Sequence, residues 1–229
     1  MSSSLLIPPS IFKRCDPLEV LHLRGDNEGT VIWDSSESSK KTIINSSGVT
    51  QSTTQRKFLG KSMYFDGTKT ISIADSTDFS FGTGEFCVEC FFYVPEAITP
   101  SKTLFAKRLN SGSYGWLFNW NAGGLAVFAG SAAGTFDIFS NVSIGTPTLT
   151  TWHHLVLNRY GNTIGVWYDG SLATSKAVTG STPFYSPACP LYLGGDSDTM
   201  FMKVYIDEFI VTKGQAKYTG AFTPSTRRR

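Results

Sequence analysis

Two hairpin turns within residues 151–178 constrain the fold of this chain more than any other feature. The stretch reads TWHHLVLNRYGNTIGVWYDGSLATSKAV. Gly161-Asn162 and Asp169-Gly170 are dipeptides that two-residue hairpin turns favour, because these turns need positive φ angles. The run before the first turn is rich in Leu, Val and aromatic residues, as strands are. The stretch therefore predicts an antiparallel meander of three strands, at 152–160, 163–168 and 171–178.

The composition favours an all-β domain with a large core. Hydrophobic residues make up 41% of the 229 residues and aromatic residues 14%, whereas only 17% are charged, below the roughly 25% of an average soluble domain. The 22 glycines suit short strands joined by tight turns better than helices, whose interiors glycine weakens. No amphipathic helix of useful length is visible. We expect one sandwich of two antiparallel sheets.

Short apolar or alternating runs along the chain predict the other strands. The longest, 85–94, ends at Pro95, which cannot donate to a strand ladder, and we expect it to be central. Three prolines and no periodicity in residues 1–17 predict an extended N-terminal arm, followed by one domain over 18–226 and a basic tail at 227–229. The further expected strands are 18–23, 30–33, 42–45, 62–65, 70–74, 102–107, 114–119, 124–129, 136–142, 190–193 and 203–212.

Charge and hydropathy exclude several partner classes. The formal net charge is +2, too small for a general grip on nucleic acid. The apolar run Leu5 to Ile7 is far shorter than a secretion-signal core or a membrane span. We therefore expect no nucleic-acid partner, no membrane segment and no export signal. The arginines at 227–229, with Lys13 and Arg14, either dock an acidic neighbour or form a solvated tail.

The cysteines and histidines point to packing rather than chemistry. Cys87 and Cys90 form a C-x-x-C pair, but residues three apart on a strand face opposite sides, so core packing is favoured over a zinc or redox site. His153 and His154 likewise face opposite sides and cannot hold one metal ion together; we expect one to be buried and one exposed. His22 is the only other histidine, and nothing supports a catalytic triad.

Two segments are candidates for ligand binding. Tyr114, Trp116 and Trp120, with Asn121 beside them, form a platform on which sugar rings would stack. The alternative is that Trp116, Phe118 and Trp120 alternate on one strand face and fill the core. Asp196 and Asp198 lie two residues apart in GGDSDTM, where their oxygens would share a calcium ion or form a solvated turn.

Four motifs give the chain a family resemblance. They are Leu21–Leu23 with Asp34–Ser36, the run 62–94, the run 151–170, and LYLGG at 191–195 with YIDEFIVTKGQAKYTGAFTP at 205–224. In this order they resemble the laminin G-like branch of the concanavalin A-like jelly rolls, particularly those of phage tail and virion proteins. The resemblance implies a jelly-roll sandwich, makes Trp-His-His a fold signature, and makes the Asp196 loop the best calcium candidate, because laminin G-like domains often hold calcium at the sandwich rim.

The resemblance also bears on catalysis. Related glucanases carry Glu-x-Asp-x-Glu on one strand, but the equivalent here has Tyr205 and Phe209 in place of the outer acids. Asp207 and Glu208, as strand neighbours, are expected on opposite faces. Without two carboxylates flanking a bond, hydrolysis is not expected. We predict that the protein is not an enzyme and that Asp207 is a structural acid.

The functional expectation is a structural or adhesion component of a phage particle: a capsid decoration, fibre or tail protein, made in the host cytoplasm and located in the virion. Its partners would be other virion proteins and further copies of itself in a symmetric oligomer. The apolar residues of the arm would supply the assembly contacts; they are Leu5, Leu6, Ile7, Ile11 and Phe12. The alternative is a lectin-like module, with or without calcium, whose partner is a host surface glycan.

Overall fold

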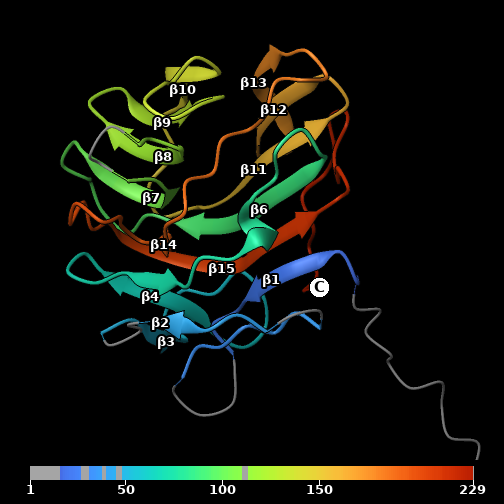
Figure 1. Cartoon of the computed structure of the whole chain (residues 1–229). Coiled ribbons are helices and arrows are strands. Elements are labelled where there is room, and N and C mark those ends of the chain that lie inside the picture. The colour runs from blue at the N-terminus through green and yellow to red at the C-terminus, as the bar shows by residue number, and fades with distance from the viewer. Residues whose placement is uncertain (1–15, 27–30, 38–39, 45–47, 110–112, 229) are drawn as a thin grey trace, which may run out of the picture.

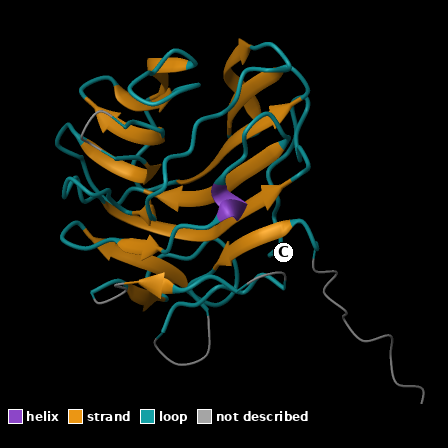
Figure 2. Ribbon diagram, viewed as in Figure 1, coloured by secondary structure: helices purple, strands orange, loops and turns teal. Residues whose placement is uncertain are grey.

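The computed structural model describes residues 16–26, 31–37, 40–44, 48–109 and 113–228. These residues form two antiparallel sheets packed face to face (Figure 1), and the helix among them is a short 3-10 turn, η1 (Thr77–Phe79), coloured purple in Figure 2. The all-β jelly-roll sandwich predicted from the sequence is confirmed. No described helix has the length and apolar character that a membrane crossing requires. The predicted arm, with Leu5, Leu6, Ile7, Ile11 and Phe12, lies outside the described residues.

Sheet A has the order β13-β12-β11-β6-β15-β4-β3, and β1 also pairs with β15. Its strands are β1 (Glu19–Leu23), β3 (Thr50–Ser52), β4 (Ser62–Asp66), β6 (Phe86–Tyr93), β11 (Trp152–Tyr160), β12 (Thr163–Tyr168), β13 (Ser171–Ala177) and β15 (Lys203–Lys213). Sheet B has the order β10-β9-β8-β7-β14-β5-β2. Its strands are β2 (Ile43–Ile44), β5 (Ile71–Ile73), β7 (Lys102–Lys107), β8 (Trp116–Asn121), β9 (Gly124–Ala129), β10 (Phe139–Gly145) and β14 (Leu191–Leu193).

β6 is the central strand that the sequence predicted. All eight of its residues are buried, between β11 on one side and β15 on the other. Its alternate side chains, including Phe86, Val88 and Phe92, enter the core between the sheets. The ring of Phe105 from sheet B meets that of Phe209 from sheet A at 5.2 Å, edge to face. The core thus joins the two sheets through aromatic contacts.

The predicted meander is present as β11, β12 and β13, neighbours in sheet A. Asp169 (φ 48°) and Gly170 (φ 82°) both adopt the left-handed backbone, and Gly161 has φ 51°. These positive φ angles are the ones that tight hairpins need. The turn chemistry read from the sequence therefore corresponds to the observed turns.

One expected strand is absent from the described residues, and one observed strand was not predicted. Residues 31–33 do not form a strand; Asp34, next in the chain, makes only an isolated bridge to Leu23. The strand that was not predicted is β3, which pairs with β4 at the edge of sheet A. β3 reads Thr-Gln-Ser, a polar run without alternation, so it carries no sequence signal for a strand.

Residues 214–228, which we call the C-terminal strap, cover part of the outer face of sheet A. Tyr218 and Phe222 stack on each other at 3.8 Å and pack with the buried Cys87, Val156 and Trp167 in a second, smaller hydrophobic cluster. The red end of the strap lies near β1 (Figure 1), where Arg228 pairs with Glu208, a neighbour of His22 in β1.

The cysteines pack as predicted. Cys87 lies in this outer cluster and Cys90 in the main core, so the two thiols face opposite sides of β6. Both are free and buried, and the prediction of core packing is confirmed.

Candidate functional site

The outer face of sheet B carries a row of side chains from four adjacent strands. Tyr192 of β14 pairs with Ala106 of β7, Ala106 pairs with Leu117 of β8, and Leu117 pairs with Phe128 of β9. Residues paired across strands share a face of the sheet. Their chain neighbours point the other way, into the core: Phe105, Phe118, Val127 and Leu191. Tyr192 and Phe128, at the ends of the row, are partly exposed.

At one end of the row lies a cluster of three rings. Phe128 meets Phe136 edge to face at 5.3 Å, and Phe136 stacks on Tyr114 at 4.7 Å with an interplanar angle of 23°. All three rings are half-buried. The hydroxyls of Ser113 and Tyr185 lie 2.8 Å apart beside them. This end offers an apolar ring surface next to hydroxyl groups, the combination that a sugar ring requires.

At the other end lies a cluster of Arg108 with two acids. The Arg108 Nε donates to Asp196 Oδ2 at 3.1 Å, and its Nη2 donates to Asp198. Burial, and with it the electrostatic influence of Cys189, Asp196 and Asp198, raises the pKa of Tyr192. The tyrosine hydroxyl therefore stays protonated beside the acids at neutral pH and can donate a hydrogen bond.

The Asp196 carboxylate is held by the protein on both oxygens. Its Oδ1 accepts hydrogen bonds from the backbone N–H groups of Asp198 at 2.9 Å and Met200 at 3.3 Å, and its Oδ2 accepts from Thr103 Oγ1 at 3.1 Å as well as from Arg108. A carboxylate has about four acceptor sites, so calcium at Asp196 and Asp198 would have to displace Arg108. No group of three or more His, Cys, Asp or Glu among the described residues is placed to hold a metal.

The four residues of the predicted sugar platform are divided between core and surface. Trp116 and Trp120 are 1% and 7% exposed and pack in the core, as the alternation of β8 indicated. Tyr114 remains at the surface in the ring cluster. Asn121 is half-buried at the end of β8, where its amide Nδ2 donates to Asn141. The surface that remains available to a ligand is Tyr114 with Phe136, rather than the two indoles.

The expectation that Asp207 and Glu208 face opposite sides was wrong. The pairing of β15 with β6 shifts register after Asp207, and Glu208 adopts φ 49°. A bulge of this kind places two residues opposite one and re-aims a side chain. Both carboxylates therefore lie on the outer face of sheet A, 3.5 and 3.3 Å from the guanidinium of Arg228. Burial, and then the charge of Glu208, raise the pKa of Asp207 to about 7.

The histidines occupy two faces but are both buried. His153 packs against Phe92 on the core side and its Nδ1 lies 2.7 Å from Asp169, whereas His154 packs against Phe91 on the outer side. The prediction of opposite faces is confirmed, and the expectation that one would be exposed was wrong. His153 is shielded by the hairpin that Asp169 begins.

The third histidine completes a buried polar layer under the C-terminal strap. The Nε2 of His22 lies 3.0 Å from Glu208, and that of His154 lies 3.1 Å from Glu89, which also accepts from the Tyr218 hydroxyl at 2.7 Å. The buried charges are thus compensated within the fold, as buried charges must be. His22, Glu89, His154 and Glu208 are each at most 3% exposed.

Sequence reasoning did not find Arg108, Tyr192 or Phe136. The signals for them are weak: Tyr192 is the outward residue of the LYL alternation, and Arg108 immediately follows a strand. Pairing of β14 with β7 places Tyr192 on the face of Ala106, and Phe136 reaches that face through its contact with Phe128.

Solved structures with the same fold include binding domains. Over 89% of this chain and 51% of the other, the chain resembles the binding domain of Paraclostridial Mosquitocidal Protein 1, with a TM-score of 0.65 and 14% identity. Over 87% of this chain and 50% of the other, it resembles the binding domain of a botulinum neurotoxin of serotype D/C, with a TM-score of 0.62 and 10% identity. The chain thus spans about half the length of these toxin domains.

A third structure matches over nearly its whole length. It is domain 4 of AbnA, an extracellular arabinanase from Geobacillus stearothermophilus, solved in complex with arabinotriose; it is 16% identical over 86% of this chain and 93% of that domain, with a TM-score of 0.61. No curated protein matches the chain. A model of the concanavalin A-like lectin/glucanases superfamily matches residues 65–215, more than half of the sequence. The chain therefore belongs to the concanavalin A-like lectin/glucanases superfamily.

Proposed function

We propose that this domain is a non-enzymatic glycan-binding module that uses the outer face of sheet B. The observation that carries the proposal is that one face of sheet B has the partly exposed rings of Tyr114 and Phe136 at one end and Tyr192 with the Arg108 cluster at the other. Ala106 and Leu117, between the two ends, are buried. Rings support the apolar face of a sugar, and the arginine, tyrosine and acid groups match its hydroxyls. The fold shared with an arabinanase domain solved with arabinotriose supports the proposal.

The absence of hydrolysis belongs to the same proposal. Asp207 and Glu208 are 0% and 2% exposed and are held by Arg228 and His22 under the C-terminal strap. A hydrolase needs two carboxylates that flank an accessible glycosidic bond. We expect no turnover of arabinan or β-glucan, and turnover that disappears on Asp207→Asn or Glu208→Gln would overturn this part.

The binding proposal is tested with a glycan array, followed by calorimetric titration of arabinotriose and of the best array ligand. Tyr114→Ala and Tyr192→Ala should each weaken binding by about tenfold, the loss expected for one ring contact or hydrogen bond. Leu172→Ala is the matched control, because Leu172 is exposed on β13 of the other sheet. Loss of binding in the control alone, or no glycan bound by the parent protein, would contradict the proposal.

Calcium is tested in the same titrations. The array is run with calcium and with a chelator, and Asp198→Asn is compared with the parent protein. If calcium binds at Asp196 and Asp198, glycan affinity should fall on chelation and the Asp198 variant should no longer respond. Equal affinities with calcium and with the chelator would remove calcium from the proposal. The Asp196 loop would then be held by the ion pairs of Asp196 and Asp198 with Arg108.

We further propose that the module acts as an adhesion component of a phage particle, assembled through the arm at residues 1–17. This finer proposal rests on the resemblance of the four motifs to virion versions of the fold. Native mass measurement of the full chain and of an arm-deleted chain tests it. We expect the full chain to be a symmetric oligomer and the arm-deleted chain to be a folded monomer. If both chains are monomeric and neither joins a particle, the proposal is contradicted.

A further inference from the structure

A basic groove lies on the outer side of sheet A, across the sandwich from the row on sheet B. Its volume is about 590 Å³, within the range of clefts that bind small ligands. Two segments distant in sequence form its walls: the loop between β3 and β4, and the end of the C-terminal strap. The lining residues are Arg56, Lys57, Phe58, Leu59, Thr226, Arg227 and Arg228.

The loop wall of the groove is held in place from beneath. Phe58 is 8% exposed, and its ring meets Phe91 of β6 edge to face at 5.2 Å. The Lys57 ammonium lies 5.0 Å from the centre of the same Phe91 ring. Ser62 Oγ donates to the carbonyl of Gln55 at 2.5 Å at the base of the loop. The cations of this wall are thus presented by an anchored loop, which lowers the entropy lost when a ligand binds.

The strap wall is anchored by Arg228. Its guanidinium pairs with Asp26, with Asp207 at 3.5 Å and with Glu208 at 3.3 Å, and it donates to the carbonyl of Lys61 at 3.2 Å. The charge of Arg228 is therefore compensated by the protein itself. Its role in the groove is to hold the strap against the loop.

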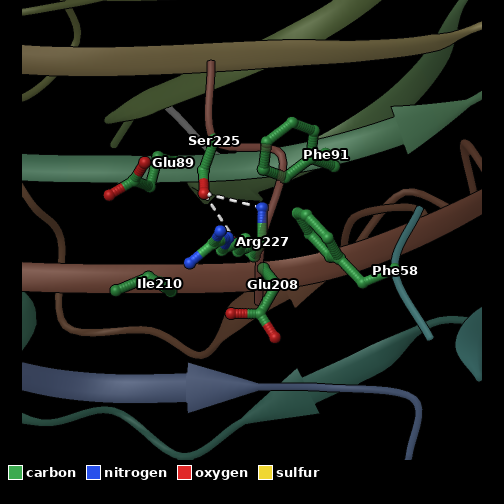
Figure 3. A pocket seen from close by; sticks show the side chains of 7 residues that line it. All are labelled: Phe58, Glu89, Phe91, Glu208, Ile210, Ser225 and Arg227. Atoms are coloured by element: carbon green, nitrogen blue, oxygen red, sulfur yellow. Dashed lines mark hydrogen bonds between the residues drawn. The ribbon is translucent and has the colours of Figure 1, made fainter. Parts of the chain in front are cut away.

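Arg227 follows a different course. Figure 3 shows its side chain between Glu89 and Glu208, above Ile210, where it also lines a cavity of about 10 Å³. No ion pair joins it to either glutamate, and the residue is exposed. Its side chain lies beside two acids, so Arg56 and Lys57 are the cations of the groove that we consider for a ligand.

The groove holds positive charge that the described part of the chain does not neutralise. No carboxylate is among its lining residues, and none of the described acids forms an ion pair with Arg56, Lys57 or Arg227. The whole chain carries only +2, so this is a local concentration of cations. A guanidinium beside an ammonium matches carboxylate, sulfate or phosphate oxygens.

The rim adds an apolar contact. Leu59 is 87% exposed, the most exposed large hydrophobic residue of the described chain. An apolar rim beside cations suits a sugar ring that bears an acidic group. A nucleic acid would need more cations, since affinity for a polyanion comes from neutralising several phosphates.

We propose that this groove binds an acidic sugar, with Arg56 and Lys57 taking its carboxylate, sulfate or phosphate group and Leu59 contacting its ring. The choice of a sugar as the carrier of the charge rests on the glycan-binding function proposed above, but the site is separate from the row on sheet B. The domain would then hold a glycan on each face, a neutral segment on sheet B and an acidic one on sheet A.

The test is calorimetric titration with trigalacturonic acid, a sulfated trisaccharide, inorganic phosphate and neutral arabinotriose. Arg56→Gln with Lys57→Gln should weaken binding of the two acidic sugars by about tenfold or more, the size of a lost charge-assisted contact. Leu59→Ser should weaken the acidic sugars but leave phosphate unchanged. Raising the salt from about 50 to about 300 mM should also weaken the acidic sugars, because exposed charges are screened.

Lys176→Gln is the matched control. Lys176 lines a second cleft, of about 470 Å³, whose lining also includes the acid Asp137. We expect this variant to bind both acidic sugars as the parent protein does, and thermal unfolding should confirm that all variants fold. Arg228 is left intact, because its loss would leave Asp207 and Glu208 buried without their cation.

Four outcomes would overturn the groove proposal: no binding of either acidic sugar, unchanged binding in the double variant, an equal loss in the Lys176 variant, or tighter binding of a single-stranded DNA of equal charge. The arabinotriose arm separates this failure from failure of the proposed function. Arabinotriose binding that Tyr192→Ala weakens and the double variant leaves intact would support the sheet B site whatever the acidic sugars do.

Discussion

At the scale of single residues, Asp207 gives the fold an unusual dependence on pH. Burial and the neighbouring Glu208 raise its pKa from 3.8 to about 7. Between these two pH values, the folded state keeps a proton on Asp207 that the unfolded chain has released. Because the folded state binds this proton more tightly, protonation of Asp207 contributes its full stabilisation below about pH 4. That contribution is lost as the pH rises to about 7. Within that window each pH unit costs the folded state up to about 1.4 kcal/mol.

The Asp207→Asn variant should therefore lack this contribution to the pH dependence. We measure the free energy of unfolding of both proteins with urea between about pH 4 and 8. As the pH rises, the value for the variant should increase relative to that of the parent protein. Asn keeps the shape of the side chain and cannot ionise. Parallel curves for the two proteins would show that folding does not raise the pKa of Asp207.

Tyr114, just before β8, and Trp116, the first residue of β8, allow a second comparison at this scale. Trp116 is 1% exposed in the core, whereas Tyr114 is half-buried against Phe136. Trp116→Ala should lower the free energy of unfolding by about 3 to 5 kcal/mol, because it leaves a large cavity. Tyr114→Ala should cost only about 1 to 2 kcal/mol, mainly the ring stack and partial burial. Equal losses in urea unfolding would contradict the division of the predicted platform between core and surface.

At the scale of elements, the two hairpins of the meander differ in how closely they are packed. Gly170 has φ 82°, and a Cβ there would lie 1.9 Å from the carbonyl oxygen of Phe222 in the C-terminal strap. Gly161 has φ 51°, and a Cβ would meet nothing within 4 Å. Gly161→Ala should cost only the backbone strain of about 1 to 2 kcal/mol. Gly170→Ala adds a clash with backbone, so its melting temperature should be clearly lower than that of Gly161→Ala.

At the scale of the whole molecule, the two ends of the chain should contribute differently to stability. The C-terminal strap covers Cys87, Val156 and Trp167 and closes the buried polar layer over Glu89. Deleting residues 214–229 would expose this apolar patch and leave buried charges without partners. We expect loss of the cooperative thermal transition, or a much lower melting temperature.

Deletion of residues 1–15 is the matched comparison. Three prolines and no periodicity in residues 1–17 predict an extended arm outside the domain, so we expect the melting temperature to stay close to that of the parent protein. The two truncated proteins are compared by differential scanning calorimetry. A strap-deleted protein as stable as the parent would mean that the outer face of sheet A tolerates solvent.

The sequence by itself determined the fold class, the positions of most strands along the chain and the hairpin turns of the meander, because these depend on local signals. Alternation placed Cys87 and Cys90 on opposite faces and left Trp116 with two interpretations, a sugar platform or the core, and Asp169-Gly170 marked a turn that needs positive φ. What the tertiary structure decided depends on residues far apart in the chain. The bulge at Glu208 arises from the pairing of β15 with β6, and it overrides the alternation that local reading assumes. Likewise β14, near the end of the chain, lies beside β7 and brings Tyr192 to the row on sheet B. Register between distant strands is set by packing, and a sequence shows only the neighbours along the chain.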